Sequence, residues 1–412
     1  MNVTADDTTG GTAAEGAPAA PEPGAGLWSL AGRWRGVGAA VGILALTRLV
    51  QLAMLLWLGA ATQDGVGLRG RLLVWDAGWF LRVAVNGYPH GYTYSVDGSM
   101  EGNGLAFFPL YPMLIRAVAA LGVEPPTAAI AVSWLASIGA AVALHLLGTS
   151  LYANLRGSSP TTGRRAGWAL VAICCAAPVS VVLSMAYSES LFLALVTGML
   201  VAAHRRVWWA AGLLGLCAAL TRPTGVAAAL ALAVAALLEL RRPDARRRWR
   251  PVAAALVALA GVPAFLGWVG WRVGDATAWF RIQSAGWGTS FDYGRSTVAF
   301  VGRTLSTGEG WVAVSVALLL LVALAAAGVA LAGRPWLPLA VYGVVAMALV
   351  YGQAGFYHSK PRLLLPVLLT LLPAVIAAAR ARPRVAVLAI TAWAAFGLWY
   401  GAYLVVVWPY TL

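Results

Sequence analysis

Charged residues are scarce in this chain. Only 11% of its 412 residues are Asp, Glu, Lys or Arg, and Lys360 is its one lysine. A soluble domain usually carries about 25% charged residues, so the composition excludes an ordinary water-soluble protein. Hydrophobic residues make up 60% of the chain, and the mean hydropathy is +0.77. The sequence therefore predicts an all-α protein that crosses a membrane several times.

Cysteine and histidine are also rare. Cys174, Cys175 and Cys217 all lie inside apolar segments, which excludes a disulfide framework or a zinc site of recognisable spacing. His145 and His204 are isolated, and no cluster of His, Asp and Glu has the spacing of metal ligands. We therefore expect neither a bound metal nor a cofactor.

Residues 1–26 lack basic side chains and are rich in Ala, Gly, Pro and Thr. This composition predicts disorder, and without a basic n-region the segment is not a signal peptide. Arg33 and Arg35 then precede the first apolar run, which we expect to be an uncleaved membrane anchor. The predicted organisation is a disordered cytoplasmic tail with its basic flank over 1–36, and one integral-membrane domain over 37–412.

The apolar runs predict ten to twelve membrane spans, because several of them are short. They fall near residues 37–60, 127–150, 167–186, 187–203, 207–221, 224–240, 251–271, 311–332, 336–356, 361–379 and 385–408. With the N-terminus in the cytoplasm, alternation places most arginines in cytoplasmic connections and the long loops 61–126 and 272–310 outside. The net charge of +14 then reflects membrane orientation rather than nucleic-acid binding.

This alternation requires that residues 105–122 not cross the membrane. The segment contains Pro109 and Pro112 and places Arg116 in its apolar part. Proline disrupts a helix and arginine is costly at mid-bilayer, so we expect an interfacial or half-inserted helix. If the segment does cross, one of the short hairpins downstream must be re-entrant.

The first outer loop contains a carboxylate framed by aromatic residues, in the segment from Trp75 to Tyr88. Asp76 is a candidate general base. The alternative is that it only caps the helix-like run that follows it. Arg82 lies six residues further on, so it does not share a helical face with Asp76, and it could snorkel to lipid headgroups instead.

Three short connections predicted to face outside also carry charge. They are Tyr187-Ser188-Glu189-Ser190, Thr221-Arg222-Pro223-Thr224-Gly225 and Tyr357-His358-Ser359-Lys360-Pro361-Arg362. Short outer loops are normally depleted of basic residues, so Arg222, Lys360 and Arg362 indicate binding of something anionic. Structural alternatives stay open: Glu189 could be a carboxylate near a helix start, and Arg222 could only end a helix before proline.

At these residues the sequence resembles the PIG-V-like mannosyltransferases, relatives of the second mannosyltransferase of GPI-anchor synthesis. The resemblance covers most of residues 37–408. Its motifs are the segment Trp75-Asp76 to Asn86-Gly87-Tyr88, Phe107-Phe108-Pro109-Leu110-Tyr111-Pro112, Tyr187-Ser188-Glu189-Ser190-Leu191-Phe192, Thr221-Arg222-Pro223-Thr224-Gly225 and Lys360-Pro361-Arg362-Leu363-Leu364-Leu365-Pro366. One departure is Phe80, where the family often has tyrosine.

The resemblance implies a GT-C-like membrane bundle, a polyprenyl- or dolichyl-phosphate mannose donor and an inverting mechanism. It implies that the acidic residue of the first outer loop, Asp76 here, is catalytic. The candidate substrate-binding residues are Trp75, Arg82, Tyr111, Glu189, Arg222, His358, Lys360 and Arg362. The expected partners are the donor, a lipid-linked or cell-envelope glycan acceptor and the bilayer of the cell membrane, with no nucleic acid.

The chemistry of a lipid-phosphate sugar agrees with these residue types. The leaving group is already activated, so the protein needs a carboxylate base and cations for the departing phosphate. No Gly-rich nucleotide-binding loop is present. The rival hypothesis is a transporter or flippase for a lipid-linked sugar. Transporters usually place polar groups near the membrane midplane and often contain internal repeats, whereas here the charges lie at one boundary and no repeat is found.

Overall fold

The computed structural model describes residues 25–152, 159–243, 248–308 and 310–410. The predicted disordered tail lies almost wholly outside the described residues, and the first helix already begins at Ala25. In this described part the α-helices are α1 (Ala25–Thr62), α2 (Leu68–Arg71), α3 (Asp76–Asn86), α4 (Leu110–Ala119), α5 (Pro125–Tyr152), α6 (Pro160–Cys175), α7 (Glu189–His204), α8 (Trp208–Ala219), α9 (Gly225–Leu240), α10 (Trp249–Val273), α11 (Ala278–Trp287), α12 (Arg295–Thr307), α13 (Gly310–Ala332), α14 (Leu337–Gly352), α15 (Lys360–Leu364), α16 (Leu372–Arg380) and α17 (Pro383–Val406).

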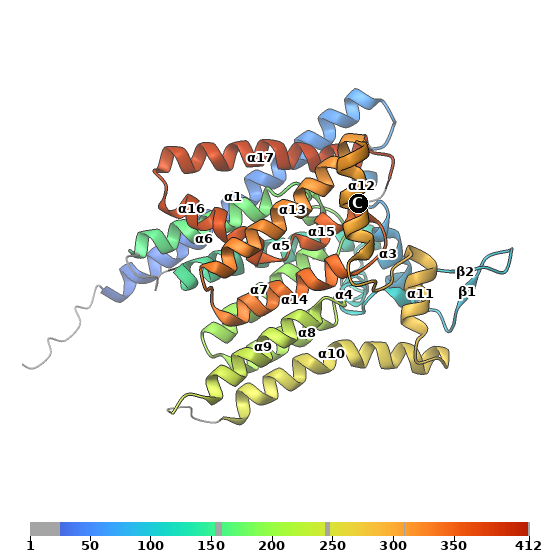
Figure 1. The fold of residues 1–412 in the computed structure, drawn as a ribbon, viewed down its shortest axis with the longest axis horizontal. Helices are drawn as coiled ribbons and strands as arrows, with labels where there is room; N and C mark the ends of the chain where they lie inside the picture. The colour runs from blue at the N-terminus through green and yellow to red at the C-terminus, as the bar shows by residue number, and fades with distance from the viewer. Residues whose placement is uncertain (1–24, 153–158, 244–247, 309, 411–412) are drawn as a thin grey trace, which may run out of the picture.

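Short elements connect these helices. They are the 3₁₀ turns η1 (Gly104–Ala106), η2 (Ser180–Leu183), η3 (Tyr357–Ser359) and η4 (Leu368–Leu371), and the strands β1 (Thr93–Tyr94) and β2 (Met100–Glu101). The strands pair antiparallel, with Thr93 opposite Glu101. They form a small hairpin that projects from one end of the bundle (Figure 1).

The predicted all-α, multi-pass class is confirmed. Five helices in the described residues are long and apolar enough to cross a membrane: Trp34–Thr62, Pro125–Tyr152, Trp249–Val273, Gly310–Ala332 and Pro383–Val406. The pair Tyr357–Leu364 and Leu368–Arg380, bent by 77°, adds a sixth if it is one span. The other predicted apolar runs contain helices of 12 to 16 residues, shorter than a bilayer core of about 30 Å. The number of ten to twelve spans therefore stays a prediction.

Small residues allow neighbouring helices to approach closely. A Cβ on Gly148 of α5 would lie 2.8 Å from the Cα of Gly167 on α6, and one on Gly212 of α8 would lie 2.9 Å from the Cα of Ala254 on α10. In a membrane protein such contacts replace the hydrophobic effect as a source of helix association, because lipid tails are as apolar as the side chains. The many alanine and glycine residues therefore let the helices pack closely.

The two long loops predicted to share one side lie together at the same end of the bundle (Figure 1). Leu105 and Phe108 of the first loop form a buried cluster with Phe265, Ala278 and Ile282, which belong to α10 and α11. The indole of Trp279 donates to the carbonyl of Ala106 at 3.3 Å. These contacts pack the two loops against each other, although they are far apart in the sequence.

A polar clamp also joins the two loops. The carboxylate of Asp275 accepts hydrogen bonds from the hydroxyl of Tyr92 at 2.5 Å and from the guanidinium of Arg281 at 2.8 Å. The Tyr92 hydroxyl and the hydroxyl and amide of Thr277 hold the pKa of Asp275 well below its usual range. The carboxylate of Asp275 is therefore ionised at neutral pH.

The helix α4 occupies the segment that was predicted not to cross. It has 10 residues, about 15 Å of helix, and it packs against α5 and α3. The amide of Leu110 donates to the carbonyl of Leu220 at 3.0 Å. This hydrogen bond keeps the first long loop next to the α8–α9 connection. A helix of this length does not cross a bilayer core alone, and its half-insertion stays a prediction.

Candidate active site

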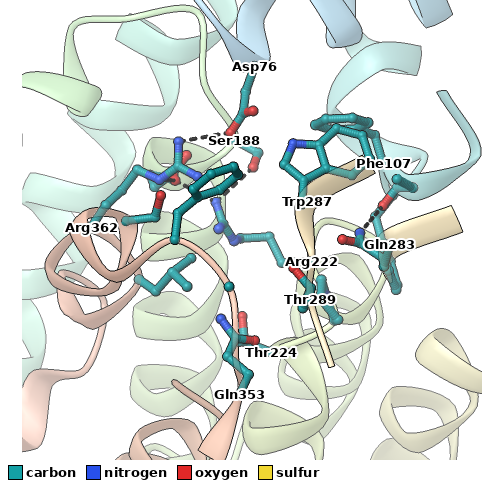
Figure 2. Close-up of a pocket in the computed structure, with 18 of the residues that line it drawn as sticks. Asp76, Phe107, Ser188, Arg222, Thr224, Gln283, Trp287, Thr289, Gln353 and Arg362 are labelled. Carbon is teal, nitrogen blue, oxygen red and sulfur yellow. Dashed lines mark hydrogen bonds and ion pairs between the residues drawn. The ribbon is translucent and has the colours of Figure 1, made fainter. Parts of the chain in front are cut away.

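A cavity lies at this end of the bundle, where α3, α7, α9, α11 and α15 meet (Figure 2). The residues around it come from both long loops and from all three of the short connections predicted to face the same side. They include Asp76, Phe107, Ser188, Glu189, Arg222, Thr224, Gln283, Trp287, Thr289, Gln353, Lys360 and Arg362. The polar groups singled out by their position in the sequence are thus brought together by the fold.

The backbone that presents Asp76 is held in an unusual conformation. Trp75, just before α3, has φ 56° and ψ −115°, a region that residues with side chains rarely adopt. The amide of Asp76 donates to the hydroxyl of Tyr187 at 3.3 Å, and that hydroxyl donates to the carbonyl of Val74 at 3.4 Å. Tyr187 is buried just before α7, and its hydroxyl holds the turn from Val74 to Asp76 in place.

The carboxylate of Asp76 is directed at Arg362, across the cavity from the aromatic residues (Figure 2). Its Oδ2 accepts a hydrogen bond from Nη1 of Arg362 at 2.8 Å. The residue in the N-cap position of α3 is Trp75, which makes no side-chain cap. The Asp76 side chain is 21% exposed and lines the cavity. Asp76 is therefore not the N-cap of α3, and its role in chemistry stays a prediction.

Glu189 connects the two arginines of the site. Its carboxylate, 2% exposed, lies 2.7 Å from Nη1 of Arg222 and 3.3 Å from Nε of Arg362. Arg222 also donates to the hydroxyl of Ser188 at 3.1 Å. A buried carboxylate is tolerated only when it is paired, and here two guanidiniums pair with it. We call Asp76, Arg362, Glu189 and Arg222 the ion-pair network.

An aromatic wall faces the ion-pair network. Figure 2 shows Trp287 and Phe107 across the cavity from Arg362, with the two rings 5.3 Å apart, edge to face. Beside them the side-chain amide of Gln283 donates to the carbonyl of Ala106 at 3.1 Å, which leaves its Oε1 to accept a hydrogen bond. Such a wall of rings and one amide suits a polar ligand with apolar faces.

Sequence reasoning missed the second loop as a source of site residues. Trp279, Gln283, Trp287 and Thr289 line the cavity, yet they have no charge that would mark them. The available signal was the placement of loop 272–310 on the same side as Asp76, combined with its tryptophans.

Lys360 lines the cavity but its ammonium is engaged elsewhere. Nζ donates to the carbonyls of Val350 at 2.8 Å and Gln353 at 2.6 Å, at the carboxyl end of α14. The side chain is buried. A lysine has three N–H donors, so one remains for a ligand. Lys360 therefore closes a helix end as well as adding positive charge near the cavity.

Other predicted substrate-binding residues lie outside the cavity lining. Trp75 packs partly against the hydrophobic core. The guanidinium of Arg82 lies 4.6 Å from the ring centre of Trp79. The hydroxyl of Tyr111 is buried and hydrogen-bonded to the carbonyl of Ala129 at 3.0 Å. These three residues support the first loop rather than contact the cavity.

His358 likewise does not line the cavity. It is buried in η3, and its ring contacts those of Phe356 at 5.4 Å and Tyr357 at 5.1 Å. Its motif therefore contributes Lys360 and Arg362 to the cavity, while His358 packs against aromatic rings.

Cysteines and metal ligands are not part of this geometry. Cys174 and Cys175 are buried and free, and Cys217 is free and half-buried. Over residues 25–152, 159–243, 248–308 and 310–410, no group of three or more His, Cys, Asp or Glu is placed to hold a metal ion.

Comparison with known proteins finds that part of the chain is similar to a known family. Residues 61–239 match the family described as Mannosyltransferase (PIG-V). Over 178 residues the chain is 33% identical to GPI alpha-1,6-mannosyltransferase 2 of Mus musculus, an alignment that covers 41% of this chain and 32% of that protein. The chain thus matches about a third of the length of this curated relative. The resemblance is confirmed for a region that contains Asp76, Glu189 and Arg222, while Arg362 lies beyond it.

Proposed function

We propose, from this family match, that the chain is a membrane mannosyltransferase that uses a polyprenyl-phosphate mannose donor. The acceptor is a hydroxyl of a lipid-linked or cell-envelope glycan, and transfer takes place on the extracytoplasmic face with inversion. The observation that carries the proposal is the convergence of Asp76, Arg222 and Arg362 on one cavity. A base and two cations are the groups that this reaction requires.

In this proposal Asp76 is the general base. The acceptor oxygen attacks the anomeric carbon of mannose while its proton passes to the carboxylate of Asp76. The bond between the anomeric carbon and the phosphate oxygen breaks, and its electron pair leaves with the phosphate. A single displacement of this kind inverts the configuration at the anomeric carbon.

Arg362 and Arg222 stabilise the charge that develops on the departing phosphate. A guanidinium presents five N–H donors in a planar fork, and the contacts to Glu189 and Asp76 use only some of them. Because the buried carboxylate of Glu189 orients both forks, little reorganisation is needed when the phosphate charge increases. The aromatic wall of Phe107 and Trp287 lies opposite, on the side from which the sugar rings contact the cavity.

Replacement of Asp76 tests the base. We expect Asp76→Asn to leave folding and membrane insertion intact and to lower turnover by about 10²–10⁴-fold, because general-base catalysis contributes that much. The measurement is transfer of labelled mannose from polyprenyl-phosphate mannose by purified protein in detergent. Asp97→Asn is the matched control, since Asp97 is an exposed acid in the same loop, on the β1–β2 turn.

The outcomes separate the proposal from its rivals. Wild-type turnover by a folded Asp76→Asn protein would remove Asp76 from the catalytic role. Purified wild-type protein that binds the donor but never releases polyprenyl phosphate would instead favour the transporter or flippase.

A further inference from the structure

A second cavity lies at the other end of the bundle from the candidate active site. The helices α7 and α9 begin beside Glu189 and Arg222 and run away from them, to His204 and Leu240 (Figure 1). The second cavity lies where they end and where α8 and α14 begin. Its polar and aromatic lining consists of His204, Arg206, Trp208, Glu239, Arg242 and Trp336. Neither the proposed reaction nor the family motifs use these residues.

The cavity carries excess positive charge at its rim. One carboxylate, Glu239, faces two guanidiniums: its Oε2 lies 3.4 Å from Nε of Arg206 and 3.7 Å from Nη1 of Arg242. Both separations exceed a good hydrogen bond. The arginine side chains are 47% and 46% exposed, and most of their donors stay free for a ligand. One carboxylate does not neutralise two cations.

Apolar side chains also line the same cavity. Ala203, Ala235 and Leu238 line it, and Trp208 is buried in its wall. The ring of Trp336 lies 5.2 Å from that of His204, edge to face. Tryptophan at the end of a membrane helix is typical of the headgroup region of a bilayer. The cavity therefore combines two exposed arginines with alanine, leucine and tryptophan side chains, at a helix-end boundary.

We propose that this cavity binds the headgroup of an anionic glycerophospholipid. The phosphate takes the free N–H donors of Arg206 and Arg242, and the glycerol and upper acyl carbons lie on the tryptophan and alanine wall. The ligand matches the cavity in charge and in polarity. It needs an anionic group for the arginines and, next to it, an apolar part for the tryptophan and alanine side chains. The site is independent of the chemistry proposed for the other cavity.

Lipid binding by the purified full chain tests this site. Native mass spectrometry in detergent measures the apparent Kd for phosphatidylglycerol and, as reference, for phosphatidylcholine. We expect the double variant Arg206→Gln/Arg242→Gln to weaken phosphatidylglycerol binding at least about fivefold, the factor that corresponds to about one basic residue at an anionic surface. Arg248→Gln/Arg250→Gln is the matched control: it removes two exposed arginines from the start of α10, outside the cavity.

A third variant covers the case in which the double variant fails to fold. Glu239→Gln removes the carboxylate that competes for both guanidiniums, and it should tighten phosphatidylglycerol binding. Equal losses in the double variant and its control, or no tightening in Glu239→Gln, would overturn the proposal. Inorganic phosphate is the last comparison. If phosphate alone protects the protein against thermal unfolding as well as phosphatidylglycerol does, and phosphatidylglycerol is not preferred over phosphatidylcholine, the cavity is a site for free phosphate and the lipid proposal is wrong.

Discussion

The guanidinium of Arg362 contacts three groups at once. It lies 2.8 Å from Asp76, 3.3 Å from Glu189 and 5.1 Å from the ring centre of Tyr187. Only a planar fork makes several directed contacts of this kind, and a lysine ammonium is a point charge on a flexible stem. Charge alone therefore does not reproduce what Arg362 does in the ion-pair network.

This geometry predicts that Arg362→Lys keeps the charge but loses activity. We expect turnover at saturating donor to fall at least about tenfold, which corresponds to about 1.4 kcal/mol in the barrier. Steady-state kinetics of the purified variant measures this. Arg82→Lys is the control, because Arg82 does not line the cavity, and it should retain near-normal turnover. Similar kinetics for both variants would limit Arg362 to a charge that lysine can replace.

Tyr187 positions Asp76 without facing the substrate. Its hydroxyl joins the amide of Asp76 to the carbonyl of Val74. We expect Tyr187→Phe to fold normally and to lower turnover about twofold to tenfold, the range for one hydrogen bond, with little change in donor KM. Tyr111→Phe loses a buried hydroxyl away from the cavity, so it should lower the apparent Tm and leave turnover unchanged. The reverse pattern in the two variants would contradict both assignments.

The sequence singled out the charged residues that line the cavity but not its aromatic wall, and the roles of these residues stay predictions. Asp76, Glu189, Arg222, Lys360 and Arg362 all line the cavity. The three basic residues stood out in the sequence because short outer loops are normally depleted of such residues. The engagement of Lys360 with α14 could not be predicted, since it depends on where a distant helix ends. The aromatic wall has no such signal, because tryptophan is common at membrane boundaries for other reasons.

At the scale of the helices, close packing of α5 against α6 depends on glycine. Gly148→Ala places a Cβ 2.8 Å from the Cα of Gly167, so the helices must separate. We expect a loss of about 1–3 kcal/mol, typical of overpacking, seen as a lower apparent Tm of the protein in detergent. Gly139→Ala in the same helix meets only ordinary contact, 3.8 Å from the Cβ of Ala194, and should keep or raise the Tm. A Tm equally unchanged in both would mean that the interface yields without cost.

The apolar runs predicted where helices form, but their exact number of crossings depends on tertiary structure. A run such as 167–186 contains the second part of α6, then a break at residues 176–179 and the turn η2. Backbone carbonyls on both sides of the break accept hydrogen bonds from another helix. Arg48 of α1 donates to the carbonyl of Ser180 at 2.5 Å and to the carbonyl of Cys175. Local hydropathy does not register a partner that lies 132 residues away in the sequence.

At the scale of the whole molecule, the gathering of the site at one end of the bundle agrees with the predicted alternation of the spans. Every charged connection assigned to the outer side contributes to the cavity, and both long loops cover it. A shift of parity at one span between residues 222 and 362 would have put Arg222 and Arg362 at opposite ends of the bundle. The convergence therefore supports the predicted relative placement of the loops, whichever side of the membrane they face.

The absolute orientation is a separate prediction that single cysteines test. In a background with Cys174, Cys175 and Cys217 replaced by alanine, Val96→Cys lies at the exposed tip of the β1–β2 hairpin and Arg248→Cys at the exposed start of α10. We expect an impermeant thiol reagent on intact cells to label position 96 and not position 248, because the arginine-rich connections stay in the cytoplasm. Permeabilised cells should label at both positions, which controls for reactivity. Labelling of intact cells at 248 alone would place the cavity of Asp76 on the cytoplasmic side, and transfer on the extracytoplasmic face would then be wrong even if the chemistry were right.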